Sequence, residues 1–144
     1  MSQRDIALIG NFSCSNRGDA AILRGLSDHL QASGIPVRVF SEQSDVAAYI
    51  LDAPCEPSPL SRIRASELRS LFFSHLHNVP TPVRHLSGRI RAVENSLKDV
   101  AGIIFVGGSY FLDSYGQSKY YLPFLAQALG IPFALCGHSI GPFA

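Results

Sequence analysis

The sequence predicts an α/β fold, a Rossmann-like open parallel sheet with helices on both faces. Three uninterrupted apolar runs support this prediction, Ile6–Gly10, Gly102–Val106 and Phe133–Cys136. Strands that are buried on both faces, as in a parallel sheet, lose the alternation of polar and apolar residues. Each run leads into a polar loop that contains glycine. Ligands bind at the carboxyl ends of the strands in open α/β sheets, so we expect the three loops to share a cleft.

The first run should be followed by a helix and a second strand. An apolar stripe at helical spacing predicts a helix from about Asp19 to Ser33. Gly34 stands where a left-handed cap would end this helix, and Pro36 cannot continue it. Val37–Phe40 is the second predicted strand. The short connection between this helix and this strand is typical of α/β units.

The middle of the chain carries the weakest strand signal. A short helix is expected over Ser44–Leu51, with Ser44 as its N-cap. Pro54–Pro59 contains three prolines and is expected to be a loop. Helices are predicted over Ser61–His77 and Leu86–Leu97.

The last part of the chain repeats the order of the first. A helix is predicted from about Lys119 to Leu129, and Gly130 and Pro132 then end it. The chain stops where a further helix is expected after the last strand. We therefore interpret residues 1–144 as one N-terminal Rossmann-like domain, with residues 54–98 as a helical insertion or flap and with a C-terminal domain absent.

Composition and charge limit the kinds of partner. The hydrophobic share of 47% and the charged share of 16% are those of a globular protein. A net charge of +1 gives no electrostatic reason to expect nucleic acid. Residues 61–98 are locally basic, with seven Lys or Arg against two Asp or Glu. This stretch could meet an anionic membrane or an acidic partner, and a solvated helix face explains it as well.

Cysteines and histidines give no sign of a disulfide framework or a metal. Cys14, Cys55 and Cys136 are odd in number and lack CxxC spacing, so a reducing cytoplasm is expected. His75 and His77 would not share a helical face, and no metal site is predicted. No apolar stretch approaches the length of a signal-peptide core or a transmembrane helix.

Three short motifs, taken together, resemble the polysaccharide pyruvyl transferase family. Asn16–Ile22 reads N-R-G-D-A-A-I, Val106–Ser109 is a glycine turn followed by Asp113, and Gly137–Phe143 reads G-H-S-I-G-P-F. The family carries N-x-G-D-x-A-I after the first strand, a glycine-rich turn followed by an aspartate, and G-x-S-I-G-P-F. The turn here reads Gly-Gly-Ser, where the family usually has three glycines. The resemblance runs along the whole chain in order, and residues 54–98 add nothing specific to it.

This resemblance implies one half of a two-domain, GT-B-like architecture. It implies transfer of a pyruvyl group from phosphoenolpyruvate to a hydroxyl pair of a surface-polysaccharide sugar, or of its lipid-linked precursor, to form a cyclic ketal. No cofactor is implied. The reaction is expected in the cytoplasm or at the inner face of the membrane, with peripheral membrane contact and a homo-oligomer left open. Much of the basic set that binds phosphoenolpyruvate would lie in the absent domain, so the isolated chain is expected to be inactive.

Ketal formation needs a general acid, ligands for an anion and a general base. His138 is the first catalytic candidate, because it follows a buried strand and an imidazole transfers protons near neutral pH. The alternative is a ring that hydrogen-bonds a neighbouring loop. Asp19 is the second candidate, as a contact to the acceptor hydroxyl. Its alternative role, compatible with the first, is a carboxylate that caps the first helix.

Nine further residues are substrate-binding candidates. Arg17 could hold a phosphate or carboxylate through two parallel hydrogen bonds, or it could be a solvated loop residue. The glycines would allow a positive φ or a close approach of the backbone. Neighbouring polar side chains could bind sugar hydroxyls. The set is Gly10, Asn16, Arg17, Gly18, Gly107, Gly108, Ser109, Asp113 and Ser139.

Two other function classes stay open. A sugar-nucleotide-dependent glycosyltransferase half would share this architecture, and its melting temperature would respond to a UDP-sugar instead of phosphoenolpyruvate. A non-catalytic α/β binding module predicts that Asp19→Ala and His138→Ala leave partner binding intact. NAD binding is disfavoured, because the loop after Gly10 lacks the G-x-G-x-x-G fingerprint.

Overall fold

The computed structural model describes residues 4–10, 16–62, 88–107 and 121–137, and there it is an open parallel sheet with helices. Five strands pair in parallel in the order β3-β2-β1-β4-β5. They are β1 Asp5–Gly10, β2 Val37–Ser41, β3 Cys55–Pro57, β4 Val100–Val106 and β5 Phe133–Cys136. The helices are α1 Arg17–Ala32, α2 Ser44–Leu51, α4 Gly88–Leu97 and α5 Tyr121–Ala128, with a short 3₁₀ helix η1 at Pro59–Arg62. The predicted Rossmann-like α/β class is confirmed.

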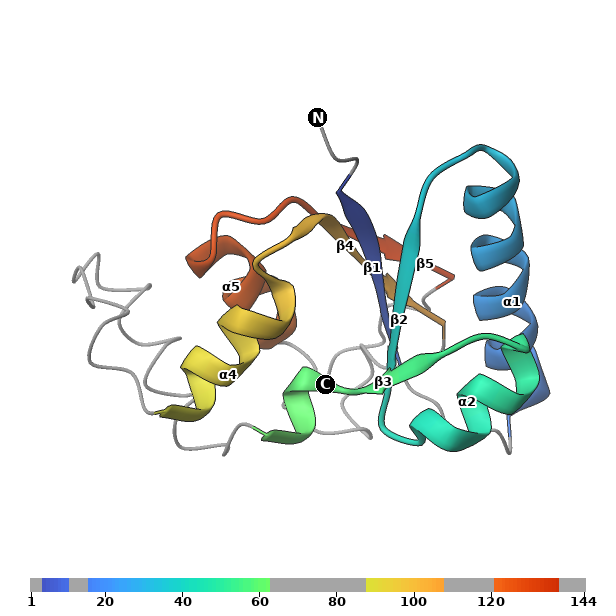
Figure 1. Cartoon of the computed structure of the whole chain (residues 1–144), viewed down its shortest axis with the longest axis horizontal. Coiled ribbons are helices and arrows are strands. Elements are labelled where there is room, and N and C mark those ends of the chain that lie inside the picture. The colour runs from blue at the N-terminus through green and yellow to red at the C-terminus, as the bar shows by residue number, and fades with distance from the viewer. Residues whose placement is uncertain (1–3, 11–15, 63–87, 108–120, 138–144) are drawn as a thin grey trace, which may run out of the picture.

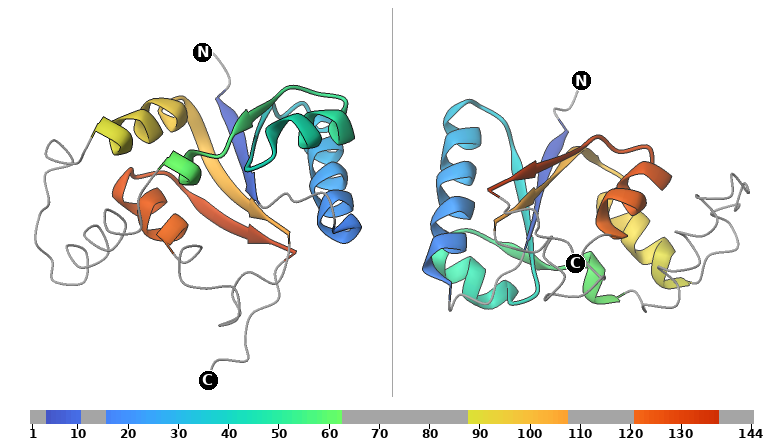
Figure 2. Two further views of the ribbon diagram at one scale, coloured as in Figure 1. Left: turned by 90° about the horizontal axis from the view of Figure 1, so that it is seen from below. Right: turned by 180° about the vertical axis from the view of Figure 1, so that it is seen from behind.

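Helices cover both faces of the sheet, as Figures 1 and 2 show. On one face, Leu23 of α1 and Leu51 of α2 pack with Leu8 of β1 in one hydrophobic cluster. On the other face, α4 and α5 form a second cluster that includes Ile9 of β1 and Phe105 of β4. Successive residues of β1 therefore point into two different cores. This arrangement explains why the apolar runs show no polar alternation.

Helix α1 begins two residues before the predicted start. Asn16 is its N-cap, with an extended backbone and a side chain that accepts a hydrogen bond from the Gly18 N–H. After the helix, Gly34 adopts a φ of +74°, and Gly130 after α5 adopts +67°. The two glycines thus take the left-handed conformation that the sequence predicted for helix ends.

Helix α2 spans the predicted residues, but the prediction that Ser44 caps it is wrong. Gln43 is the N-cap residue and makes no side-chain capping bond, while Ser44 is already helical. The preceding turn is instead held by Ser41, whose hydroxyl accepts a hydrogen bond from the Gln43 N–H at 3.0 Å. Ser41 is fully buried at the end of β2.

The prediction that Pro54–Pro59 is entirely a loop is also wrong, because Cys55–Pro57 form the edge strand β3. Val39, Phe40 and Ser41 of β2 are paired with the three residues of β3. Prolines are tolerated there since an edge strand is paired on one side only.

Within the described residues, α4 confirms the helix predicted over Leu86–Leu97, and α5 confirms the helix expected over Lys119–Leu129. Val93 and Leu97 of α4 are fully buried, so this helix belongs to the core. Of the helix predicted over Ser61–His77, residues 63–77 lie outside the described residues.

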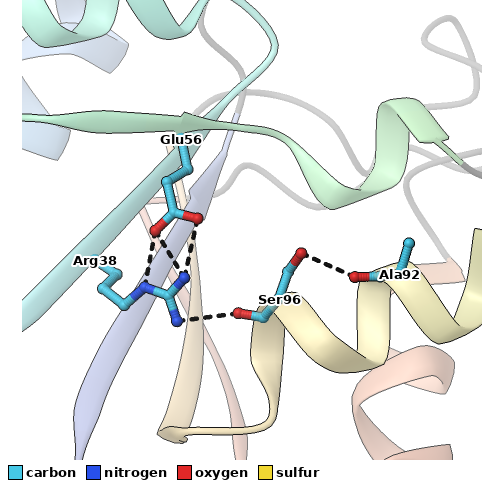
Figure 3. Close-up of polar contacts among 4 residues, drawn as sticks. All are labelled: Arg38, Glu56, Ala92 and Ser96. Carbon is cyan, nitrogen blue, oxygen red and sulfur yellow. Dashed lines mark hydrogen bonds and ion pairs between the residues drawn. The ribbon is translucent and has the colours of Figure 1, made fainter.

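Arg38 joins β2, β3 and α4 in one polar network, shown in Figure 3. Its guanidinium donates to both carboxylate oxygens of Glu56 at 2.7–2.9 Å. It also donates to the backbone oxygen of Ser96 at 3.0 Å, near the end of α4. The Arg38 guanidinium lies 5.1 Å from the centre of the Phe40 ring. This network fixes the edge strand and the end of α4 to the sheet.

Candidate functional site

The carboxyl ends of β1, β4 and β5 lie side by side in the sheet. Gly10 pairs with Val106, and Val106 pairs with Cys136. The Gly107 N–H then donates to the Cys136 carbonyl at 2.8 Å. The three glycine-bearing loops therefore start from one edge of the sheet, as the sequence predicted.

The order of the strands reverses direction between β1 and β4. From β1 the chain proceeds to β2 and β3 on one side, and it then returns to β4 and β5 on the other side. In open α/β sheets, ligands bind outside the carboxyl ends of the strands at such a reversal. Gly10 and Gly107 mark this position in the structure.

The first turn of α1 follows β1 at this edge and is held by Asn16. The Asn16 Oδ1 accepts from the Gly18 N–H at 3.0 Å, and the Asn16 Nδ2 donates to the Asp19 Oδ2 at 3.0 Å. Both ends of the carboxamide are thus in use, which fixes its orientation. A Cβ atom at Gly18 would lie only 3.3 Å from the Asn16 Oδ1, so glycine admits the close approach of this cap.

Asp19 is buried, with 7% of its surface exposed, and it contacts the beginning of the loop after β4. A Cβ atom at Gly107 would lie 3.4 Å from the Asp19 Cβ, and Gly107 has a φ of +77°. Asp19 is not the N-cap residue of α1, because Asn16 holds that position. It accepts a hydrogen bond from the side chain of Asn16, which is the cap.

Arg17 is the first residue of α1 and is exposed. With the other described residues it forms no ion pair. Its charge adds to the positive end of the helix macrodipole, so this corner attracts anions. The contribution is modest at an exposed position, because water and salt screen it.

Five predicted site residues lie outside the described residues: Gly108, Ser109, Asp113, His138 and Ser139. The described chain ends at Gly107 before the first three and at Gly137 before the last two. The structure brings together Gly10, Asn16, Gly18, Asp19 and Gly107 at the same edge, with Arg17 on the adjoining surface.

Gly137 and Ile22 also lie at this edge, although neither was predicted to be a site residue. Gly137 has a φ of +73°, and a Cβ atom there would lie 3.1 Å from both Cδ1 and Cγ2 of Ile22. The G-x-S-I-G-P-F motif contains Gly137, and N-x-G-D-x-A-I ends at Ile22, so both were visible in the sequence. Their contact was not, because it depends on how α1 packs across β4 and β5.

A hollow of about 300 Å³ lies elsewhere, between the ends of α4 and α5, and Glu94, Lys98 and Leu129 help to line it. It lies toward the amino ends of β4 and β5, away from the glycine loops. Within the described ranges no three His, Cys, Asp or Glu side chains gather as a metal site would require. Nor does any described helix have the length and apolar character needed to cross a membrane.

The fold and the edge just described define a Rossmann-like α/β domain whose candidate ligand site lies between β1 and β4. A family model described as polysaccharide pyruvyl transferase matches residues 16–144, and the chain belongs to that family. The chain is also 28% identical over 157 aligned positions to a protein named amylovoran biosynthesis protein AmsJ from Erwinia amylovora. That alignment covers 96% of this chain and 37% of AmsJ, so the chain spans little more than a third of that relative. No solved structure matches significantly.

Proposed function

We propose that this chain supplies one wall of a site that transfers a pyruvyl group from phosphoenolpyruvate to a sugar of a surface polysaccharide or its precursor. The observation that carries the proposal is the family match over residues 16–144. The arrangement of the strand ends supports it, because Asp19 and Ile22 of the first motif lie beside Gly107 and Gly137, in the other two motifs. The name of the relative, a protein of amylovoran biosynthesis, supports a role in polysaccharide synthesis.

The proposed reaction converts a sugar diol and phosphoenolpyruvate into a cyclic ketal and inorganic phosphate. The methylene carbon of the enol takes up a proton, and one sugar hydroxyl bonds to the neighbouring carbon. The second hydroxyl then bonds to the same carbon, and the bond between this carbon and the phosphate oxygen breaks. The two hydroxyl protons end on the new methyl group and on phosphate. Such a reaction needs proton transfer and stabilisation of a cationic centre beside a dianionic leaving group.

In this proposal, the described residues bind and orient, and the loops supply the proton transfer. His138 would move protons, while Asp113, Ser109 and Ser139 would bind sugar hydroxyls. Arg17, beside the positive end of α1, would hold the carboxylate or phosphate.

Gly10, Gly18, Gly107 and Gly108 would let the backbone approach the substrates. Asp19, proposed from the sequence as a catalytic contact to the acceptor hydroxyl, is buried against Gly107 and bonded to Asn16.

We also propose that the second half of the site comes from a further domain in a GT-B-like arrangement. The much greater length of AmsJ supports this idea. The reaction would take place in the cytoplasm, at the inner face of the membrane when the acceptor is lipid-linked. The three cysteines, odd in number and without CxxC spacing, support a reducing compartment.

A thermal-shift titration tests the donor. Phosphoenolpyruvate should raise the melting temperature of this chain in a saturable way, because a ligand that binds only the folded state stabilises it. A UDP-sugar should leave the melting temperature unchanged, and inorganic phosphate at equal concentration controls for simple anion binding. A shift with the UDP-sugar alone would instead favour a glycosyltransferase.

A turnover assay tests the half-site idea. Phosphate release from phosphoenolpyruvate in the presence of a glycan acceptor should be near background for this chain. It should be robust for a longer protein that adds the remaining family sequence. Robust ketal formation by the isolated chain would refute the need for a second half.

A further inference from the structure

One stripe of α1 contacts the starting points of two of the loops that would form the site. Asp19 and Ile22 are one helical turn apart and face the same side of α1. Asp19 lies against Gly107 at the end of β4, and Ile22 lies against Gly137 at the end of β5. The Gly107 N–H donates to Cys136, so the two strand ends are also bonded to each other.

The backbone at both glycines is restricted, and at Gly137 the contact with α1 is also tight. Gly107 and Gly137 have φ values of +77° and +73°, a conformation that other L-residues adopt at a cost. The nearest atoms to their Cβ positions are carbons of α1, at 3.4 Å for Gly107 and 3.1 Å for Gly137. The direction in which the chain leaves β4 and β5 is therefore limited by the same helix surface.

The hydrogen bonding and packing of Asp19 suit a residue that holds its neighbours in position. Its Oδ2 accepts from Asn16, whose own Oδ1 caps the Gly18 N–H. The aspartate is thus bonded to the N-cap of α1 on one side and packed against Gly107 on the other.

We propose that Asp19 and Ile22 are positioning residues, which set the exits of the chain from β4 and β5 and couple these exits through α1. Asp19 also acts through Asn16, whose carboxamide it orients. The meaning of this coupling for catalysis rests on the proposed function, whereas the coupling itself does not. A shift of α1 would move both loop starts together.

The first experiment compares Ile22→Val with Ile6→Val by amide NMR of the ¹⁵N-labelled chain. Each change removes one methyl group from a partly buried isoleucine of the same hydrophobic cluster. Ile22→Val should shift the amide signals of both Gly107 and Gly137, and Ile6→Val should leave both in place. The coupling would be overturned if Ile22→Val moved only signals of α1, or if both variants moved the glycines equally.

A second comparison separates positioning from proton transfer at Asp19. Asp19→Asn keeps an oxygen that can accept from Asn16, so the Gly107 amide signal should stay near its wild-type position. Asp19→Ala removes the acceptor and the carboxyl carbon that lies beside Gly107, so the same signal should move. Equal shifts in the two variants would overturn a positioning role for the carboxyl oxygen.

The third readout is the affinity for phosphoenolpyruvate, measured by titration of the same samples. Ile22→Val and Asp19→Ala should weaken it roughly two- to thirtyfold, the range typical of residues that act through others. Ile6→Val should stay close to wild type. A wild-type chain that binds no phosphoenolpyruvate would count against the proposed function, while the amide shifts would still decide the coupling. Unchanged affinity in Ile22→Val, with a wild-type chain that binds, would overturn the proposed positioning role.

Discussion

Asn16 stabilises the start of α1 through two side-chain hydrogen bonds, one to Gly18 and one to Asp19. Asn16→Ala should lower the free energy of unfolding by about 0.5–2 kcal/mol, because an N-cap satisfies a backbone N–H that otherwise has no partner in the helix. Urea denaturation followed by circular dichroism measures this loss.

Ser44→Ala is the matched control for the Asn16 prediction. Ser44 lies at the start of α2 but is already helical, and the N-cap of α2 makes no side-chain bond. We expect a change of less than about 0.5 kcal/mol, as for most substitutions that remove no special interaction. A loss as large as that of Asn16→Ala would contradict the assignment of the caps.

Gly107 and Gly25 should respond to alanine in opposite directions. Gly107→Ala should cost about 1–2 kcal/mol or more, since it forces an L-residue to a φ of +77° and places a methyl group against Asp19. Gly25 lies within α1, and no atom lies within 4 Å of its Cβ position. Gly25→Ala should therefore stabilise the protein by about 0.5–1 kcal/mol. Melting temperatures of the two variants check the signs, and a neutral Gly107→Ala would contradict the left-handed backbone conformation at Gly107.

For single residues, the sequence predicted well which positions are important, but it predicted their individual roles less well. The motif singled out Asn16, Gly18 and Asp19 together. Asparagine and aspartate are both good N-caps, so the sequence alone could not tell that Asn16 caps α1 and that Asp19 is buried behind it. This division of roles is visible only in the fold, where Gly107, from a strand far along the chain, lies against Asp19.

Among the elements, β3 depends on the ion pair between Arg38 and Glu56. Their closest atoms are 2.7 Å apart, and the guanidinium also bonds to Ser96 at the end of α4. Glu56→Ala should cost about 1–2 kcal/mol, as for hydrogen bonds to a charged group that is partly shielded from water. Chemical denaturation at moderate salt measures it.

Asp28→Ala is the control for Glu56→Ala. Asp28 pairs with Arg24 along α1 at 3.5 Å, and both side chains are more than half exposed. Such pairs contribute little, so we expect a change of no more than about 0.5 kcal/mol. Equal losses in the two variants would mean that the Arg38 network is no stronger than an ordinary surface pair.

The elements that the sequence predicted best are those with a distinct hydrophobic pattern. Apolar runs predict β1, β4 and β5, and an apolar stripe at helical spacing predicts α1. Glycines predict where the helices end. Strand β3 has three residues and ends in proline, so no pattern could reveal it. It exists because β2 offers a free edge and Arg38 offers a partner for Glu56.

In the whole molecule, protection from hydrogen exchange should follow the order of the strands. Strand β1 is paired on both sides, and Ala7, Leu8 and Ile9 are almost fully buried, whereas β3 is a short edge. Amides of β1 and β4 should exchange only through global unfolding, and those of β3 through local opening. Exchange measured at several urea concentrations distinguishes the two routes. Amides of β3 that exchange as slowly as those of β1 would contradict this prediction.

At the scale of the whole chain, the sequence predicted a shared edge for the three glycine loops, and the strand register agrees with it. The sequence could not predict the order of the strands, because an apolar run carries no information about which strand it will pair with. It also could not predict that α1 would contact the ends of both β4 and β5. These features arise from packing between segments that are distant in sequence.

The central place of β1 has a consequence for how the protein is made. Ile9 pairs with Phe40 on one side and with Phe105 on the other, so one partner is near in sequence and the other is remote. The unit β1–α1–β2 can form early from local contacts, while closure of the β1–β4 pair is slower because a long loop must be ordered first. A nascent or stalled chain that has reached only the first unit would present two bare strand edges, those of β1 and β2, open to aggregation and to chaperones. The place where a substrate would bind would come into being only with the late arrival of β4.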